Sequence, residues 1–245
     1  FMYAQQAVVE AMNDTNEFKG HWHNVTAGST SESLRRMEYL HSMGARMCMF
    51  DFLTAGFAAS SDVFAKAAEL NMIVHCHRAM HAVFTRQKNH GIHMRVVAKW
   101  LRLTGGDHLH TGTVVGKLDG SWNDTLGIID LLRERTTKTN PDHGIYFDQD
   151  FGGLKAVWPV ASGGIHIHHI PDLLRIYGND AFFLFGGGTH GHPKGSRPGA
   201  RANRVAVEEL VAGKTLKQAA RTCPELREAM ELWSDVRFDV QTELG

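Results

Sequence analysis

The sequence predicts an α/β protein: a TIM (β/α)₈ barrel truncated to about six βα units and followed by C-terminal helices. Three observations predict it: short apolar runs typical of strands, segments with helical spacing between them, and polar or glycine residues where each run ends. Such alternation favours a parallel sheet, because right-handed crossovers place helices on the sheet faces. An open doubly wound sheet shares the alternation. We favour the barrel, because in a barrel every strand ends at the active-site face.

The predicted strands are runs rich in β-branched, aromatic and other apolar residues. They lie at residues 21–26, 46–51, 72–77, 108–113, 157–161 and 182–186. The chemically useful groups at their ends are Asn24, Asp51, His77 with Arg78, His110, Ser162 and the glycines after Phe185. A closed barrel of this type has eight strands, so about two βα units are expected to be missing.

The helices between the strands are amphipathic, and their ends carry the expected residues. Ser60 or Ser61 is predicted to cap the start of one helix, and Pro171 suits the first turn of another. Gly178 and Gly213 follow periodic stretches, as glycines that end helices do. After Gly213 the pattern is helical only. We therefore predict a partial barrel at residues 1–213 and a C-terminal helical extension at residues 214–245.

Composition excludes several classes of protein. Lys and Arg number 26 and Asp and Glu number 26, so no net charge attracts nucleic acid or an anionic membrane. The three scattered cysteines lack metal-ligand spacing and are expected to be buried thiols in a reducing compartment. No run approaches the roughly 20 apolar residues that cross a bilayer. A soluble cytoplasmic protein is expected.

The strongest cluster of polar residues lies at the end of the third predicted strand. His75, His77 and His81 surround Arg78 within seven residues. An arginine can hold a phosphate through two parallel hydrogen bonds, and histidine can transfer protons near neutral pH. The alternative is that these side chains only cap the strand end by hydrogen bonds. The presence of Arg78 favours the functional interpretation.

Two glycine-rich segments follow the last two predicted strands. They are Ser162-Gly163-Gly164-Ile165 and Gly186-Gly187-Gly188-Thr189. Glycine lets a ligand approach backbone N–H groups closely, and phosphate sites recur at the last two strands of barrels. Each segment alone could simply be a turn. Two of them at corresponding places favour phosphate binding.

The loop at residues 111–120 holds Lys117 between Gly116 and Gly120, in the manner of a hinged lid that carries a cation. It is not a P-loop, because Leu118 stands where Ser or Thr is required. A surface turn with a solvated lysine is the alternative.

Two groups of histidines late in the chain invite a metal-site interpretation, which we reject because no carboxylate or cysteine lies at suitable spacing. One or two of the first group are expected to face solvent. The two groups are His166, His168 and His169, and His190 and His192.

Six segments together resemble the large subunit of ribulose-bisphosphate carboxylase, in the family's order and over nearly the whole chain. Each fragment alone is weak evidence, but the joint set is highly specific. The segments are residues 77–83 (HRAMHAV), 86–91 (RQKNHG), 105–108 (GGDH), 112–117 (GTVVGK), 160–165 (VASGGI) and 185–189 (FGGGT).

The resemblance implies a Mg²⁺-dependent enzyme that enolises ribulose 1,5-bisphosphate, adds CO₂ and cleaves the product to two 3-phosphoglycerates, with O₂ as competitor. It implies that His77 transfers protons and that Lys117 stabilises the carboxylated transition state. One phosphate would be held by Arg78, His110 and Ser162, and the other by the backbone around Gly163, Gly164, Gly186, Gly187 and Gly188.

The resemblance also implies a dimer-based homo-oligomer. The carbamylated Lys, Asp and Glu that hold the metal in this family are expected before Phe1, so this chain alone is expected to be inactive. Details such as Thr85-Arg86-Gln87 are closer to microbial, archaeal-like members of form II/III or III. Such an enzyme could serve nucleoside monophosphate (AMP) salvage. The alternatives are a carboxylase-like enolase or isomerase of methionine salvage and a non-catalytic fragment.

Overall fold

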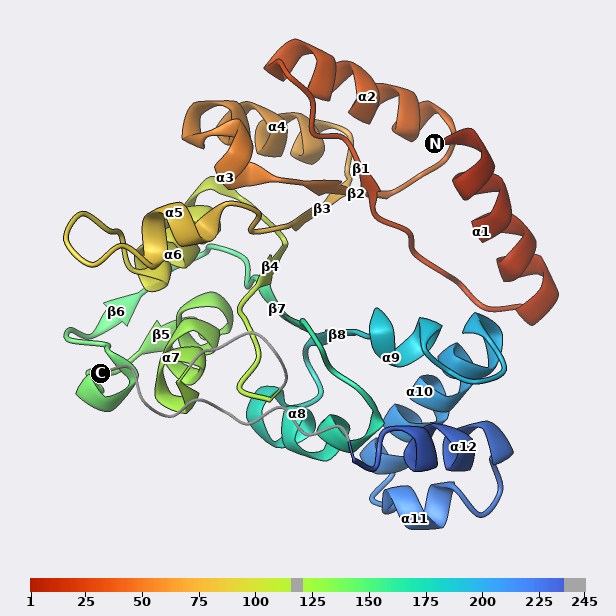
Figure 1. Ribbon diagram of the computed structural model, residues 1–245. Helices are drawn as coiled ribbons and strands as arrows, with labels where there is room; N and C mark the ends of the chain where they lie inside the picture. Colours follow the sequence, from red (N-terminus) through yellow and green to blue (C-terminus); the bar gives the residue numbers. More distant parts are fainter. Residues whose placement is uncertain (116–120, 236–245) are drawn as a thin grey trace. The chain divides into compact units, whose positions relative to one another are not determined.

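The computed structural model describes residues 1–115 and 121–235 (Figure 1). Its contacts divide the chain into two compact units, each interrupted in sequence. Unit 1 comprises Phe1–His110, Leu131–Thr136 and Asp150–Val157. Unit 2 comprises Thr111–Asp130, Thr137–Gln149 and Trp158–Gly245. Each unit is described below by itself.

Unit 1 contains four parallel strands that are neighbours in chain order. Cys48 pairs with both His23 and Val74, and Cys76 pairs with Leu109, so the carboxyl ends of the strands lie at one edge. Residues just after each strand are therefore neighbours. The strands are β1 (His23–Asn24), β2 (Met47–Phe50), β3 (Ile73–Cys76) and β4 (His108–His110).

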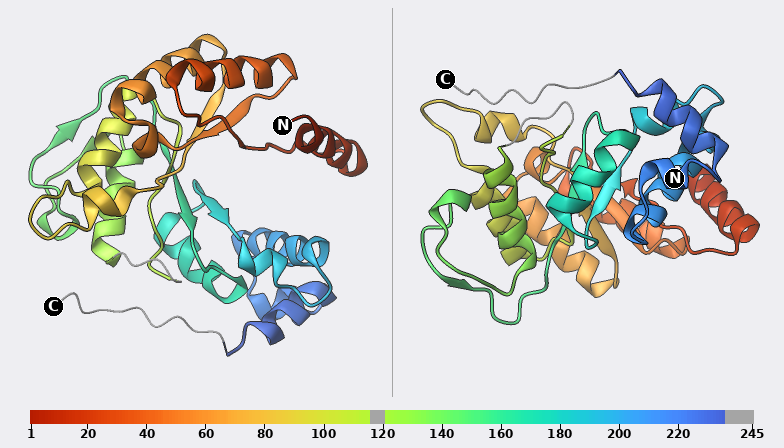
Figure 2. Two further views of the ribbon diagram at one scale, coloured as in Figure 1. Left: turned by 45° about the horizontal axis from the view of Figure 1, so that its top comes forward. Right: turned by 90° about the horizontal axis from the view of Figure 1, so that it is seen from below.

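In unit 1, helix α4 packs against β3 and lies between α2 and α6, whereas α1 buries none of its residues (Figure 2). Helix α2 begins at a Ser29 cap, whose side chain accepts from the Glu32 N–H, and it buries Met37 and Leu40. The helices are α1 (Met2–Thr15), α2 (Thr30–Ser42), α3 (Phe52–Ala55), α4 (Phe57–Glu69), α5 (His81–Thr85) and α6 (Met94–Thr104).

The predicted capping by Ser60 or Ser61 is wrong. Helix α4 begins after Gly56, four residues earlier than a Ser60 cap and five earlier than a Ser61 cap would require, and Gly56 has a φ of 93° that favours glycine. Ser60 lies inside the helix, and its hydroxyl donates to the backbone oxygens of Phe52 and Gly56. The serine therefore joins the short helix α3 to α4.

A buried arginine holds the later segments of unit 1 in place. The Arg102 side chain is among the largest fully buried ones. Its guanidinium donates to the backbone oxygens of Leu131 (2.7 Å), Glu134 (2.7 Å) and Lys155 (3.1 Å), and it lies 4.0 Å above the ring of Phe151. The Leu131 oxygen is buried and needs this donor, and the three bonds together connect helix α6 to residues 131–136 and 150–157 of the unit.

Unit 2 contains the parallel strands β7 (Trp158–Ser162) and β8 (Phe182–Leu184), in which Ser162 is opposite Leu184. The backbone N–H of Thr111 donates to Val160 O at 3.0 Å, so the segment leaving β4 runs beside β7. The buried Tyr177 fixes that segment, because its hydroxyl donates to Gly112 O at 2.6 Å.

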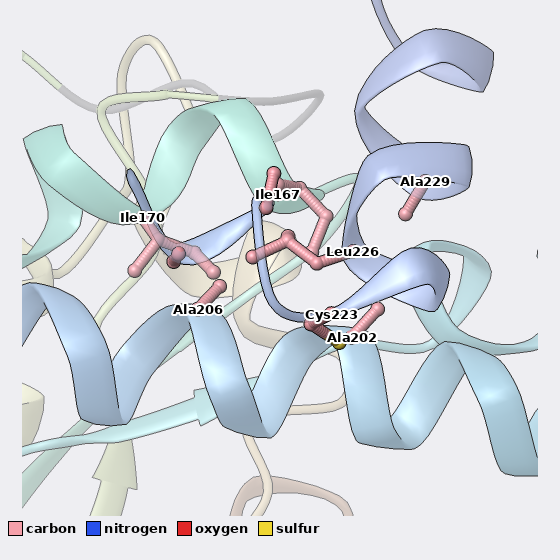
Figure 3. Packing of buried hydrophobic residues seen from close by; sticks show 9 residues of the cluster. Ile167, Ile170, Ala202, Ala206, Cys223, Leu226 and Ala229 are labelled. Atoms are coloured by element: carbon pink, nitrogen blue, oxygen red, sulfur yellow. The ribbon is translucent and has the colours of Figure 1, made fainter. Parts of the chain in front are cut away.

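The C-terminal helices of unit 2 enclose a small apolar core, shown in Figure 3. Leu226 and Ala229 of α12 lie against Ala202 and Ala206 of α10, and alanine at these places lets the two helices approach closely. The helices that lie in unit 2 are α8 (Ile170–Tyr177), α9 (Gly187–His190), α10 (Ser196–Val211), α11 (Leu216–Ala219) and α12 (Pro224–Leu232), with 3₁₀ turns η1 (Pro141–His143) and η2 (Ile167–His169). Helix α7 (Trp122–Arg133) begins in unit 2, and its last three residues belong to unit 1.

All six predicted strands are present, each shorter than predicted or shifted by a residue or two. Pro171 lies in the first turn of α8, and Gly178 and Gly213 follow the ends of α8 and α10, as predicted. The sequence did not predict a second, two-stranded sheet formed by β5 (Thr136–Thr137) and β6 (Gln149–Asp150).

The three cysteines, Cys48, Cys76 and Cys223, are buried free thiols, as expected. Burial raises the pKa of Cys48 to about 12 and that of Cys76 well above its ordinary value. Within the described part of the chain, no helix combines the length and the apolar character that crossing a bilayer requires.

Candidate active site

In unit 1, four consecutive strands each contribute a polar side chain at the carboxyl end. Asn24 and His110 are the last residues of β1 and β4, whereas Asp51 and His77 directly follow β2 and β3. The parallel register makes them neighbours: the backbone N–H of His77, for example, donates to Phe50 O at 3.0 Å. This set of side chains is the strand-end cluster of unit 1.

A carboxylate and an amide hold one of these imidazoles. Asp51 Oδ1 lies 2.7 Å from His77 Nδ1, and Asn24 Nδ2 donates to Asp51 Oδ2 at 3.1 Å. A carboxylate only accepts hydrogen bonds, so Nδ1 of His77 must carry the hydrogen. The neutral ring then has its lone pair on Nε2. His77 keeps 42% of its side chain exposed, against 18% for Asp51, so the ring is accessible while its partner is largely covered.

Two buried histidines form a second pair. His75 Nε2 lies 2.7 Å from His110 Nε2, and only 1% and 7% of these residues are exposed. Burial lowers the pKa of His75 to about 3 and that of His110 to about 2, with smaller contributions from the neighbouring charges. Both rings are thus neutral at pH 7, and one Nε2 donates to the other. Trp22 stacks on His75 with ring centroids 4.0 Å apart.

The turn after His77 carries the guanidinium and a further imidazole. Arg78 is half-buried, and its backbone oxygen accepts from the His81 N–H at 3.0 Å. Met80 closes this turn with a φ of 66°, a left-handed conformation that costs a methionine about 1 kcal/mol. Burial, with the charges of Arg78 and Arg86, lowers the pKa of His81 to about 4. His81 is therefore neutral near pH 7.

In unit 2 the strand ends carry glycine instead. Gly163 and Gly164, after Ser162 of β7, have φ values of 108° and 68°, which side chains rarely tolerate. After β8, Gly186 and Gly187 are exposed, and a Cβ built on either one would meet nothing within 4 Å. Open space therefore lies beside this backbone.

Gly188 differs from the two glycines before it. It is buried, and a Cβ there would lie 2.7 Å from Ile165 O and 3.1 Å from His166 Cα. This glycine is required for the close approach of the two glycine segments of unit 2. Its expected role in binding substrate stays a prediction.

The structure brings His77 and His110 together in unit 1, and it gives unit 2 the residues Ser162, Gly163, Gly164, Gly186, Gly187 and Gly188. Lys117 lies outside the described residues. The role of Asp51 as a partner of His77 was not predicted, although the sequence placed both at neighbouring strand ends. Pairing each strand-end carboxylate with the histidine ending the next strand could have found it.

The late histidines differ from expectation. None of the first group is fully exposed: His166 is buried, and His168 and His169 are only partly exposed. His166 stacks on Trp233, which the sequence could not show because these residues are distant in the chain. In residues 1–115 and 121–235, no group of three or more His, Cys, Asp or Glu side chains could hold a metal ion.

Comparison with known protein families identifies the chain. The family model of the ribulose bisphosphate carboxylase large chain, catalytic domain, matches residues 1–233. The chain belongs to this family. The match covers both the strand-end cluster and the glycine segments. The fold-class prediction is confirmed, because parallel strands alternating with helices agree with an incomplete (β/α)₈ barrel of the ribulose bisphosphate carboxylase catalytic domain.

Proposed function

We propose that this chain supplies the bisphosphate-binding and proton-transfer residues of a ribulose-1,5-bisphosphate carboxylase, which forms two 3-phosphoglycerates from its substrate and CO₂. The observation that carries the proposal is a carboxylate-held imidazole, His77, followed directly by the guanidinium of Arg78. The first serves proton transfer and the second binds an anion, and enolising a sugar bisphosphate needs both.

In the proposed chemistry, His77 Nε2 exchanges a proton with the substrate. Its lone pair is available because Nδ1 carries the hydrogen that Asp51 accepts. A positioned imidazole of this kind contributes roughly 10²–10⁴-fold to a proton-transfer step.

Arg78, His110 and Ser162 are proposed to hold one phosphate, and the glycine backbone of unit 2 the other. His110 is neutral, so it contributes a hydrogen bond and no charge. It can donate from Nδ1 only if its Nε2 accepts from His75, and phosphate binding would select this arrangement of the pair. The positive charge of this proposed phosphate site then comes from Arg78.

Mg²⁺ is part of the proposal through the family alone. The described residues do not fit it, since they hold no suitable group of ligands, and we derive no step through the metal. Its ligands are proposed to lie elsewhere in a longer polypeptide that forms a homo-oligomer. Lys117, proposed to meet the carboxylated transition state, favours carboxylation over the enolase or isomerase alternative. Incorporation of labelled CO₂ by that polypeptide would decide between them.

The binding proposal can be tested on the 245-residue chain by calorimetry with ribulose 1,5-bisphosphate. Arg78→Ala removes a charged hydrogen-bond donor worth about 1.5–3 kcal/mol, so the dissociation constant should rise by about 10- to 100-fold. Arg35→Ala is the matched control, because Arg35 lies on α2, 70% exposed and paired with Glu32. Equal affinities for both variants would contradict the proposal.

A further inference from the structure

We infer that Asp51 is a positioning residue: it fixes the orientation and the tautomer of His77, so that Nε2 is the nitrogen that can exchange a proton with the substrate. The inference deepens the proposed function and rests on it for its catalytic meaning. The structural part rests only on residues of unit 1. Asp51 touches His77 through Oδ1 and Asn24 through Oδ2, so both oxygens have a partner.

Asp51 is held through its backbone as well as through its carboxylate. Its backbone N–H donates to Thr26 Oγ1 at 2.8 Å, while the Thr26 N–H donates to Asn24 Oδ1 at 2.9 Å. The backbone oxygen of Thr26 accepts from Arg36 Nη1 at 2.7 Å. The segment after β1 is thus tied both to Asp51 and to helix α2. A carboxylate fixed in this way can in turn fix a ring.

The Asn24 amide can be oriented only one way in this network. Its Oδ1 accepts from a backbone N–H, so its Nδ2 must be the group that faces Asp51. At position 51 this donor requires an acceptor. An aspartate offers one to Asn24 and a second to His77, whereas an asparagine has only one oxygen to offer.

This arrangement balances the proton transfer. When a substrate hydroxyl transfers its proton, the O–H bond breaks, its electron pair stays on the oxygen, and the proton goes to His77 Nε2. The imidazolium that results keeps Nδ1–H directed at the Asp51 carboxylate, which stabilises the positive charge. The ring of His110 has its centroid 5.0 Å from that of His77 and is neutral, so it adds no opposing charge.

The test uses the full 245-residue chain labelled with ¹⁵N-histidine, at pH 8, where ordinary imidazoles are neutral. Nitrogen shifts distinguish the two tautomers, and His77→Gln identifies the signal. The wild type should show Nδ1–H with bare Nε2. In Asp51→Asn the oxygen of the new amide should turn to Asn24 and its NH₂ to His77, so the ring should switch to the Nε2–H tautomer.

Asp130→Asn is the matched control, because Asp130 accepts from His143 Nδ1 at 2.9 Å and forms the same kind of pair elsewhere. It should leave the His77 signal unchanged. An Nε2–H tautomer in the wild type, or an unchanged tautomer in Asp51→Asn, would overturn the inference. Should Asp51→Asn not fold, the wild-type spectrum decides alone.

The calorimetric experiment separates the two proposals. Asp51→Asn should bind ribulose 1,5-bisphosphate within about twofold of the wild type, because Asp51 acts through His77 and not on the phosphates. In a catalytically complete protein, kcat should fall about 10²-fold with KM little changed, within the range for lost proton transfer. A normal tautomer switch with unchanged binding by Arg78→Ala would overturn the proposed function and support the role of Asp51.

Discussion

The two units present their strand ends in opposite ways. Unit 1 ends its strands with side chains that hold one another: Asn24 holds Asp51, Asp51 holds His77, and His75 holds His110. Unit 2 follows its strands with glycines, of which Gly163 and Gly164 have positive φ and Gly186 and Gly187 lie beside open space. The geometry at the strand ends is thus fixed in unit 1 by hydrogen-bonded side chains, whereas in unit 2 it depends on residues that lack a Cβ.

This difference predicts which kind of substitution destabilises each unit. Loss of a side chain should damage unit 1, because it leaves a buried partner unsatisfied. Gain of a side chain should damage unit 2, because its backbone has no room at particular positions. The predictions below test this contrast, beginning with the largest expected effect.

Replacing Arg102 by Met should destabilise unit 1 by about 3–4 kcal/mol, because the buried oxygen of Leu131 and the partly buried oxygens of Glu134 and Lys155 lose a charged donor. Urea denaturation followed by circular dichroism measures the free energy of unfolding. Arg35→Met, at an exposed pair on α2, should change it by less than about 0.5 kcal/mol. If both variants lost the same free energy of unfolding, unit 1 would not depend on its side-chain donors as proposed.

Adding a methyl group at Gly188 should destabilise unit 2 by about 1–3 kcal/mol, because the new Cβ would lie 2.7 Å from the backbone oxygen of Ile165. Gly187→Ala supplies the neighbouring comparison, since its Cβ would meet nothing within 4 Å. The melting temperature of Gly188→Ala should fall, whereas that of Gly187→Ala should stay near that of the wild type. If Gly188→Ala were as stable as Gly187→Ala, the close approach would not constrain this unit.

Acid should weaken unit 1 through its buried histidines. Burial lowers the pKa of His75 from 6.5 to about 3. Below pH 6.5, therefore, His75 binds a proton in the unfolded chain but stays neutral in the folded chain. This contribution to stability is complete above pH 6.5 and declines as the pH falls toward 3. In His75→Phe the loss of unfolding free energy between pH 6 and 5 should be smaller by about 1.2 kcal/mol. An unchanged slope would show that this ring does not carry the effect.

Much of the fold followed from local sequence. Apolar runs located the six strands, and residues such as Pro171 and Gly178 located helix ends, because these signals act within a few residues. Ser60 misled for the same reason: a serine is a good cap only where the chain enters the helix, and here Gly56 starts it earlier. The short β5–β6 pair has too few residues to leave a periodic signal.

The site was harder to predict than the fold. His77 and Arg78 stood out because they cluster in sequence, and Gly188 because it lies in a glycine run. The partners Asp51 and Asn24 lie 26 and 53 residues before His77, so only the strand register brings them together. The neutrality of His110 likewise depends on burial by distant residues, which composition and spacing do not reveal.

The three enclosed thiols give each unit its own reporter. Cys48 and Cys76 belong to unit 1 and Cys223 to unit 2, and at most 3% of any of them meets solvent. An alkylating reagent can therefore reach them only when the surrounding unit opens. As urea or acid is added, mass spectrometry can identify which cysteine is modified first. The order of modification would show which of the two units opens more easily, without any engineered probe.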